Sequence, residues 1–271
     1  MTTSCHPEPS AALRGVSGAS GKDRQMEKNA VVTILYAFII GIGSVLLVRL
    51  ILFSASVISA LVYIFGSNPR KRTERKALAS LFFVLYGLAA VAGQMTLNGR
   101  PSAFSVLVLS GLALGAVGDV LLEVSRGRRG LFVAGGASFA AGHLLYIAAF
   151  ALVYPGHALY AAAAAVPAAV LITVTLCAVF GIGGQKRAAV AVYACVLSFM
   201  ASYAVICAFV SRDTRFLRIA SGAVLFLASD ILLAINIFSK NKKKAVGTVC
   251  LLCYYAGQLL IASGLYQWSP W

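Results

Sequence analysis

The sequence predicts an all-α protein, a polytopic bundle of transmembrane helices, and three observations lead to this prediction. Hydrophobic residues make up 60% of the chain and charged residues only 11%, whereas soluble domains carry about 25% charged residues. Apolar runs of about 20 residues, the length that crosses a hydrocarbon core, recur from Ala30 almost to the C-terminus. Short polar connections separate these runs, and lipid-facing backbone must be helical because nothing else satisfies its hydrogen bonds.

The N-terminal part of the chain divides into two regions. Residues 1–29 are polar and are expected to form a disordered tail, whereas residues 30–271 are expected to form a multi-pass membrane domain that carries the catalytic residues. The apolar run 30–66 is interrupted only by Arg49 and is longer than one membrane crossing requires. It forms either one long span or two spans joined by a tight turn near Arg49. We favour one, which makes eight spans in total rather than nine.

Seven clearer spans follow this run. They are expected near residues 77–95, 104–123, 131–151, 157–181, 188–210, 218–238 and 245–265. In the span 104–123, Gly111 and Gly115 are four residues apart and Gly118 follows one turn later, a spacing that permits close helix contact.

The formal net charge of +15 raises the possibility of a nucleic-acid partner. The basic residues, however, lie mainly in alternate connections between apolar runs, and this distribution indicates membrane topology rather than nucleic-acid binding. The connections rich in Lys and Arg are expected to be cytoplasmic, which puts Trp268 and Trp271 on the opposite side of the membrane. The clusters are Arg70, Lys71, Arg72, Arg75 and Lys76; Arg126, Arg128 and Arg129; Lys186 and Arg187; and Lys240 with Lys242 to Lys244.

Asp119 and Asp230 are the acidic residues that lie well inside predicted spans. A carboxyl group at mid-helix costs about 2.5 to 3.5 kcal/mol on insertion scales, so such residues tend to face the bundle interior and to be functional. The structural alternative is that each aspartate pairs separately with Arg, Lys or backbone groups to hold helices together. Arg49 is the only basic residue in the middle of an apolar run, which leaves few partners for two carboxylates. Glu123 is expected to form a surface ion pair with Arg126.

His143 lies in the middle of its span, on a helical face that combines small and polar side chains. A lone histidine in a helix is either a hydrogen-bonded packing residue or, beside embedded aspartates, part of a site. The other members of this face are Gly135, Phe139, Gly142 and Tyr146, and both His143 and Tyr146 are candidates for substrate binding. No zinc-ligand spacing is present, so no metal site is expected.

Further hydrogen-bonding side chains lie in the last three spans. Tyr193 is either a membrane-belt residue or a site residue, and Gln258 serves either interhelical bonding or a substrate pocket. Asn236 is expected to make a polar contact at a helix end, while it also stays a candidate for substrate binding. The remaining candidates for substrate binding are Ser229, Tyr254 and Tyr255.

With these residues the chain resembles the YhhN-like lysoplasmalogenase family, also called the transmembrane protein 86 family. The resemblance runs from about residue 77 to 265 and rests on five segments in matching order and spacing. These are Gly118-Asp119, Phe139 to Phe150 with Gly142-His143 at its centre, Val190 to Tyr193, Leu225 to Phe238, and Tyr254 to Leu260. The long polar N-terminus and the first apolar run depart from the compact beginning that is usual in this family.

The resemblance implies an eight-span hydrolase that cleaves the vinyl ether bond of lysoplasmalogens to a fatty aldehyde and glycerophosphocholine or glycerophosphoethanolamine. It implies no cofactor, a lysophospholipid substrate in the bilayer, and membrane lipids as surroundings. It also implies the endoplasmic reticulum membrane for a eukaryotic source and the inner membrane for a bacterial one.

Vinyl ether cleavage needs a strong acid and a nearby anion, so we assign these two roles to Asp119 and Asp230. Which of the two is the acid stays open. Residues His143, Tyr254, Tyr255 and Gln258 would position water, the glycerol hydroxyl or the headgroup. A proton-coupled transporter that uses the two aspartates as a relay is the alternative. An intramembrane aspartyl protease is disfavoured because Ser229-Asp230 and Ala116-Val117-Gly118-Asp119 lack the expected Tyr-Asp and Gly-x-Gly-Asp signatures.

Overall fold

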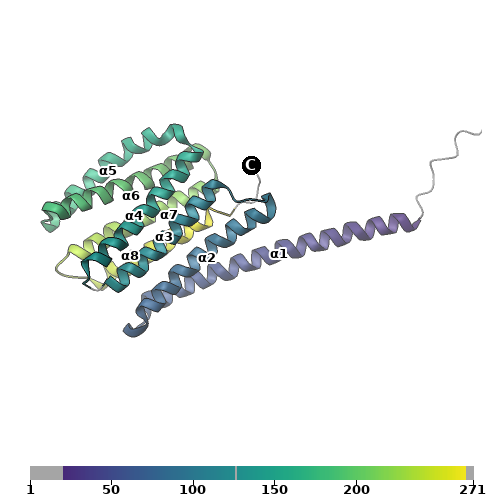
Figure 1. Ribbon diagram of the computed structural model, residues 1–271, viewed down its shortest axis with the longest axis horizontal. Coiled ribbons are helices and arrows are strands. Elements are labelled where there is room, and N and C mark those ends of the chain that lie inside the picture. The colour runs from purple at the N-terminus through teal and green to yellow at the C-terminus, as the bar shows by residue number, and fades with distance from the viewer. Residues whose placement is uncertain (1–20, 126, 267–271) are drawn as a thin grey trace, which may run out of the picture. The chain divides into compact units, whose positions relative to one another are not determined.

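The computed structural model describes residues 21–125 and 127–266, and its long elements are all α-helices (Figure 1). Within these residues, eight helices are long and apolar enough to cross a membrane, which confirms the predicted all-α bundle of eight spans. The helices are α1 (Gly21–Phe65), α2 (Arg72–Asn98), α3 (Ala103–Ser125), α4 (Arg129–Val153), α5 (Ala158–Phe180), α6 (Gly184–Ser211), α7 (Thr214–Phe238) and α8 (Lys244–Ser263). Short 3-10 turns, Pro69–Lys71 and Pro155–His157, precede α2 and α5.

The first apolar run is one continuous helix, as predicted. Arg49 lies inside α1, and the segment suited to cross the membrane is Val45–Phe65. The helix already begins at Gly21, so the expectation of a disordered tail up to residue 29 is wrong for residues 21–29. Lys, Arg, Gln, Met and Glu in this stretch are strong helix formers and extend the helix that the apolar segment starts. Residues 1–20, Arg126, Trp268 and Trp271 lie outside the described residues.

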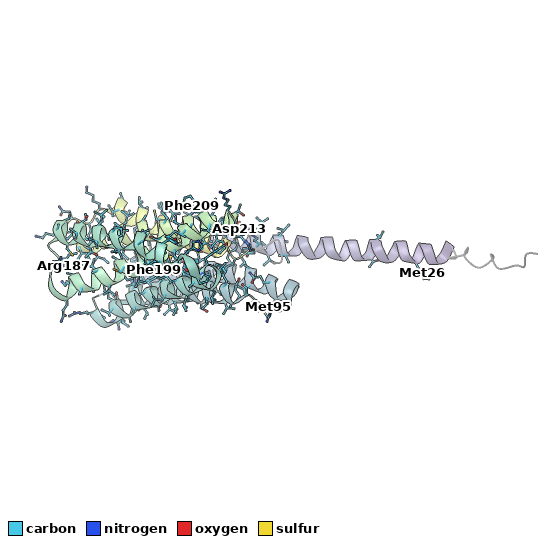
Figure 2. All side chains as sticks on the ribbon, turned by 90° about the horizontal axis from the view of Figure 1, so that it is seen from above. Met26, Met95, Arg187, Phe199, Phe209 and Asp213 are labelled. Atoms are coloured by element: carbon cyan, nitrogen blue, oxygen red, sulfur yellow. The ribbon has the colours of Figure 1, made fainter. Side chains whose placement is uncertain are left out.

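The chain divides between Leu47 and Val48 into two compact units. The bundle and the site described below belong to the second unit. In this unit, each helix runs antiparallel to the next, because short connections join them. The connections after α1, α3, α5 and α7 therefore meet at one end, which we call the basic end because the Lys- and Arg-rich segments lie there. Figure 2 shows Arg187, near the start of α6, and Asp213, just after its end, at opposite ends of the bundle.

Helix α2 begins at Arg72, earlier than the span 77–95 predicted from hydropathy. The Asn68 side chain accepts a hydrogen bond from the Arg70 backbone N–H, and Pro69 then starts a 3-10 turn that leads into the helix. Glu74 in the first turn favours the same start. As a result, Lys76 belongs to a helix that packs in the bundle and not to a solvated connection.

Glycines bring the helix backbones close together in two places. A Cβ atom on Gly222 of α7 would lie 2.6 Å from the Gly257 carbonyl oxygen of α8, so these helices touch through their backbones. A Cβ on Gly111 of α3 would overlap the Tyr146 ring of α4, and one on Gly118 would lie 2.7 Å from the Phe139 ring. The close contact predicted from the Gly111 spacing is confirmed.

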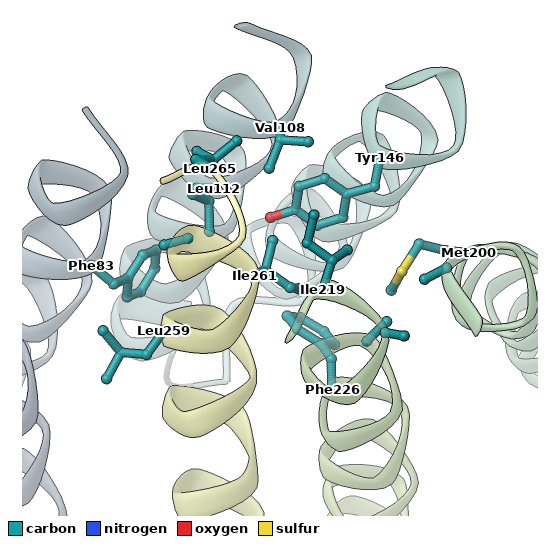
Figure 3. Packing of buried hydrophobic residues seen from close by; sticks show 14 of the residues in the cluster. Phe83, Val108, Leu112, Tyr146, Met200, Ile219, Phe226, Leu259, Ile261 and Leu265 are labelled. Atoms are coloured by element: carbon teal, nitrogen blue, oxygen red, sulfur yellow. The ribbon is translucent and has the colours of Figure 1, made fainter. Parts of the chain in front are cut away.

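The interior of the bundle is an apolar cluster to which most helices contribute. Phe83 from α2, Leu112 from α3, Phe226 from α7 and Ile261 from α8 are each at most 1% exposed and lie side by side (Figure 3). Many other leucines and valines are exposed on the outside of the helices, as expected where lipid is the solvent. Near the basic end, a cluster of polar side chains around Asp119 interrupts this apolar interior.

Candidate active site

Asp119 is buried near the end of α3, with 2% of its surface exposed, and three polar side chains hold its carboxylate. The hydroxyls of Ser80 and Tyr254 each donate a hydrogen bond of 2.6 Å to Oδ2. The Lys76 ammonium group lies 3.3 Å from Oδ1. Since these partners come from α2 and α8, the carboxylate joins α3 both to the preceding helix and to the last one.

The Lys76 ion pair corrects the expectation that the embedded aspartates lack basic partners. Lys76 seemed to belong to the basic connection, but it is only 7% exposed, and Ser80 follows it by one turn on the same face of α2. Arg49, the basic residue expected in the membrane, lies elsewhere, with its guanidinium 4.1 Å from the centre of the Tyr266 ring. Asp119 therefore does pair with a basic residue that holds two helices together, as the structural alternative expected. If Asp119 also takes part in catalysis, it does so as an ion-paired carboxylate.

Glu123 forms a second polar group one turn closer to the basic end. It accepts hydrogen bonds from Arg72 Nε at 2.9 Å and from the Tyr63 hydroxyl of α1 at 3.0 Å. Its side chain is only 9% exposed, so it is more buried than the predicted surface ion pair. Arg126, the predicted partner, lies outside the described residues. Lys76 lies 5.9 Å from the centre of the Tyr63 ring, which makes this group continuous with the surroundings of Asp119.

Asp230 lies on α7 in different surroundings. It is only partly buried, and the Tyr193 hydroxyl of α6 donates a 2.6 Å hydrogen bond to its Oδ2. No ion pair involves Asp230 among the residues that the structure describes. The bundle thus contains one carboxyl group with a counter-ion and, among the described residues, a second one without.

A row of aromatic rings connects the partners of the two aspartates. The Tyr254 ring lies 5.3 Å from Phe226, Phe226 lies 4.7 Å from the His143 imidazole, and the imidazole lies 6.1 Å from Tyr193. All distances join ring centres. The fold therefore brings together three of the predicted site residues, Tyr254, His143 and Tyr193, between Asp119 and Asp230.

Several buried polar atoms along this row have no hydrogen-bond partner within the described part of the chain. They are both ring nitrogens of His143, the hydroxyl oxygen of Tyr146, and Oε1 of Gln258, whose Nε2 donates to the Tyr254 hydroxyl at 3.2 Å. In Figure 3 the Tyr146 hydroxyl points into the bundle. Leaving such a group unpaired costs about 1–3 kcal/mol, so a cluster of them marks a place where water or a ligand supplies the missing bonds.

The other predicted substrate-binding residues lie beside this row. Tyr255 packs against Tyr63 with ring centres 6.0 Å apart and is next to the Asp119 cluster. Ser229 is buried against α8, where the Cys250 thiol donates to its carbonyl oxygen at 3.3 Å. Asn236 lies about two turns from Asp230 towards the basic end, facing Gly247 of α8. Ser229 and Asn236 are thus placed at the contact between α7 and α8.

Lys76, Ser80 and Phe226 were not predicted as site residues. For Lys76 and Ser80 a signal existed, since Arg72, Lys76, Ser80 and Phe83 recur at a spacing of three or four and therefore share one face of α2. The apolar Phe226 had no such signal, because it resembles any other core residue.

The geometry can be compared with known proteins. The model of the YhhN family matches residues 75–265. The chain belongs to the YhhN family. The YhhN match contains both aspartates, the row of rings and the Lys76–Ser80 pair, whereas Tyr63 and Arg72 precede it. No solved structure matches the chain.

Proposed function

We propose that this protein is a lysoplasmalogenase-like hydrolase that cleaves the vinyl ether bond of lysoplasmalogens inside the membrane. The observation that carries this proposal is the pair of carboxyl groups with unlike surroundings. Asp119 has a lysine counter-ion, whereas the one hydrogen-bond donor to Asp230 among the described residues is a tyrosine hydroxyl. Membership of the YhhN family is consistent with this activity.

The sequence left open which aspartate is the proton donor and which is the anion. Their different surroundings suggest an assignment. Asp119, held by Lys76 and two hydroxyl donors, is suited to remain an anion. Asp230 is partly exposed and has no cationic partner within the described residues, so it is suited to carry and deliver a proton. Such a division between two acids, one neutral and one charged, is the arrangement that acid-catalysed cleavage of ethers and glycosides requires.

The reaction then proceeds in three steps. Asp230 protonates the alkene carbon that is not bonded to oxygen, which leaves an oxocarbenium ion beside the new Asp230 carboxylate. Water adds to the carbon bonded to oxygen and returns a proton to Asp230, giving a hemiacetal. The hemiacetal collapses to a fatty aldehyde while the glycerol oxygen takes up the hydroxyl proton. Asp119 contributes fixed negative charge that stabilises the cation throughout.

The unpartnered polar atoms between the aspartates supply positions for water and for the glycerol hydroxyl. His143, Tyr146 and Gln258 all have free donors or acceptors there, and the Tyr254 hydroxyl links Gln258 to Asp119. None of these residues needs to change its protonation state in the proposed reaction. Their role is to orient the water and the substrate.

The helices themselves argue against the transporter alternative. Membrane transporters typically bind substrate and coupling ions where a helix is interrupted at mid-membrane. In the described part of the chain each span is one continuous helix, including α5, which contains Pro167. The aspartates lie on continuous helices, each in the half of its helix that is nearer to the basic end.

The decisive experiment uses purified protein in detergent, where no gradient exists. Lysoplasmenylethanolamine and its saturated 1-O-alkyl analogue are incubated with the wild type, and aldehyde is detected after derivatisation. We expect the wild type to release aldehyde from the vinyl ether alone, and the Asp230→Asn variant to release it at least about 100-fold more slowly. Absence of aldehyde with the wild-type protein would contradict the proposed hydrolase, and gradient-dependent uptake into proteoliposomes would then support the transporter.

A further inference from the structure

Two pockets outside the aspartate cluster carry an inference about how the substrate lies in the protein. We propose that a lysophospholipid binds along α6, with its phosphate in a cationic pocket at the basic end and its hydrocarbon chain in an apolar pocket between α4, α5 and α6. This inference rests on the proposed function, because it places the ether bond between the pockets, at Asp230.

The first pocket has a volume of about 490 Å³ and lies at the basic end. It is lined by the side chains of Arg129, Lys186 and Gln185, by the loop Gly181–Gly183, and by Phe238 at the end of α7. Two cationic side chains and an amide around one hollow are suited to a phosphate group, and no acidic side chain lines it. The position at the membrane boundary fits a phosphate that belongs to a lipid headgroup.

The second pocket has a volume of about 270 Å³ and an entirely apolar lining. Leu144 and Ile147 of α4, Ala165 of α5, and Cys195 and Phe199 of α6 are among its walls. Leu144 directly follows His143, and Cys195 is two residues after Tyr193. The pocket therefore lies between α4 and α6, the two helices that carry His143 and Tyr193, at the depth of His143 and just beyond that of Tyr193.

The depths of the pockets and of Asp230 follow the order of groups in a lysophospholipid. Lys186 lies at the basic end of α6, and Tyr193 follows seven residues later, about 10 Å deeper. Asp230 precedes Phe238 by eight residues, which puts it about 12 Å from the same end. Cys195 and Phe199 follow at about 14 to 20 Å below Lys186. The phosphate would thus lie at the cationic pocket and the ether bond at the depth of Asp230. The hydrocarbon chain would lie deeper, in the apolar pocket.

The exposed thiol of Cys195 reports on occupancy of the apolar pocket without any need for turnover. The wild-type protein in detergent is treated with N-ethylmaleimide, and labelling of the Cys195 peptide is followed by mass spectrometry. We expect the saturated 1-O-alkyl lysophospholipid to slow labelling of Cys195 at least about fivefold. Cys253, which lies on α8 outside the pocket and is also partly exposed, is expected to keep its labelling rate.

Variants of the apolar pocket test the chain-binding part. Cys195→Phe fills the pocket, and Val192→Phe adds the same ring to an exposed position on the same helix outside it. We expect Cys195→Phe to lower kcat/KM for long-chain lysoplasmalogens by at least about tenfold and to leave short-chain substrates unaffected. Val192→Phe should keep the wild-type profile. Equal chain-length profiles in the two variants would overturn the assignment.

Variants of the cationic pocket test the headgroup part. Arg129→Gln combined with Lys186→Gln is expected to raise KM for lysoplasmenylethanolamine about tenfold, while KM for 1-O-alkenylglycerol, which lacks the phosphate, stays unchanged. The matched control is Arg187→Gln, a neighbouring cation outside the pocket. Protection of Lys186 from acylation by inorganic phosphate, but not by the ether lysophospholipid, would assign the pocket to the free anion and overturn the proposal.

These outcomes separate the two proposals. Protection of Cys195 by the ether lipid, without aldehyde release from the vinyl ether, would retain the binding path and remove the hydrolase function. Aldehyde release with unprotected Cys195 and unchanged KM in both sets of variants would retain the function and remove the path.

Discussion

Lys76 and Asp119 form an ion pair of 3.3 Å in which the two side chains are only 9% and 3% exposed. Such a pair contributes little net stability when intact, but loss of one partner leaves an uncompensated buried charge. We expect Lys76→Met to destabilise the protein by about 3 to 5 kcal/mol, measured as a lower apparent Tm in detergent, and to abolish aldehyde release.

A double variant separates stability from chemistry at this ion pair. In Lys76→Met with Asp119→Leu both charges are gone, so the apparent Tm should return towards the wild-type value, since an apolar pair of similar volume replaces the ions. Activity should stay absent because the fixed anion is missing. Wild-type turnover in the double variant would remove Asp119 from the mechanism.

Asp230→Asn removes the proposed proton donor while keeping the shape of the side chain. We expect kcat to fall by at least about 100-fold, the lower end of the range for losing general acid catalysis, with an unchanged elution profile in size-exclusion chromatography. Tyr193→Phe, which removes the hydroxyl donor to Asp230, should have a smaller effect. The control is Asp213→Asn, a carboxylate at the opposite end of the bundle, and normal turnover is expected for it.

His143→Phe tests whether the buried imidazole serves packing or substrate. Both ring nitrogens lack partners among the described residues, and the ring packs 4.7 Å from Phe226. An apolar ring of similar shape should therefore leave the apparent Tm equal or slightly higher. KM should rise by about tenfold if the imidazole hydrogen-bonds to substrate or water. An unchanged KM would make His143 a packing residue.

Gly222→Ala tests the backbone contact between α7 and α8. The new Cβ would lie 2.6 Å from the Gly257 carbonyl oxygen, so the helices must move apart, at a cost of about 1 to 3 kcal/mol. Gly93→Ala is the matched control, because the same methyl group in α2 meets nothing within 4 Å and should stabilise the helix by about 0.5 to 1 kcal/mol. Equal Tm values for the two variants would contradict the close contact.

Asp213 caps α7 outside the membrane spans and confers a pH dependence on stability. Its side chain accepts hydrogen bonds from the Arg215 backbone N–H and guanidinium, and the Arg215 side chain holds the pKa of this carboxyl below its usual value. Because the folded-state pKa is lowered, the stabilisation is present above the unfolded pKa of about 3.9 and is lost as the pH falls through the folded value. Asp213→Ala should cost about 1 kcal/mol at pH 7. The Tm difference from the wild type should vanish in acid.

The fold was largely predictable because the lipid bilayer restricts which secondary structures can span it. An apolar run of sufficient length must be a helix, so hydropathy predicts the membrane spans. It left residues 30–66 open between one span and two, and the structure shows one continuous helix. Helix starts were less predictable. Asn68 and Pro69 move the start of α2 to Arg72, which is capping chemistry that a hydropathy window does not detect.

The cost of placing a charge in a membrane is enough to single out Asp119 and Asp230 in the sequence, and five motifs in register identify the family. Only the tertiary structure decided which side chains surround the two aspartates. The hydrogen bond of Tyr254 to Asp119 joins helices far apart in the chain, whereas the contacts of Lys76 with Asp119 and of Tyr193 with Asp230 join consecutive helices. A periodic pattern defines the face of one helix, but the neighbour of that face depends on the packing of all eight, because backbone contacts such as Gly222–Gly257 set which helices touch.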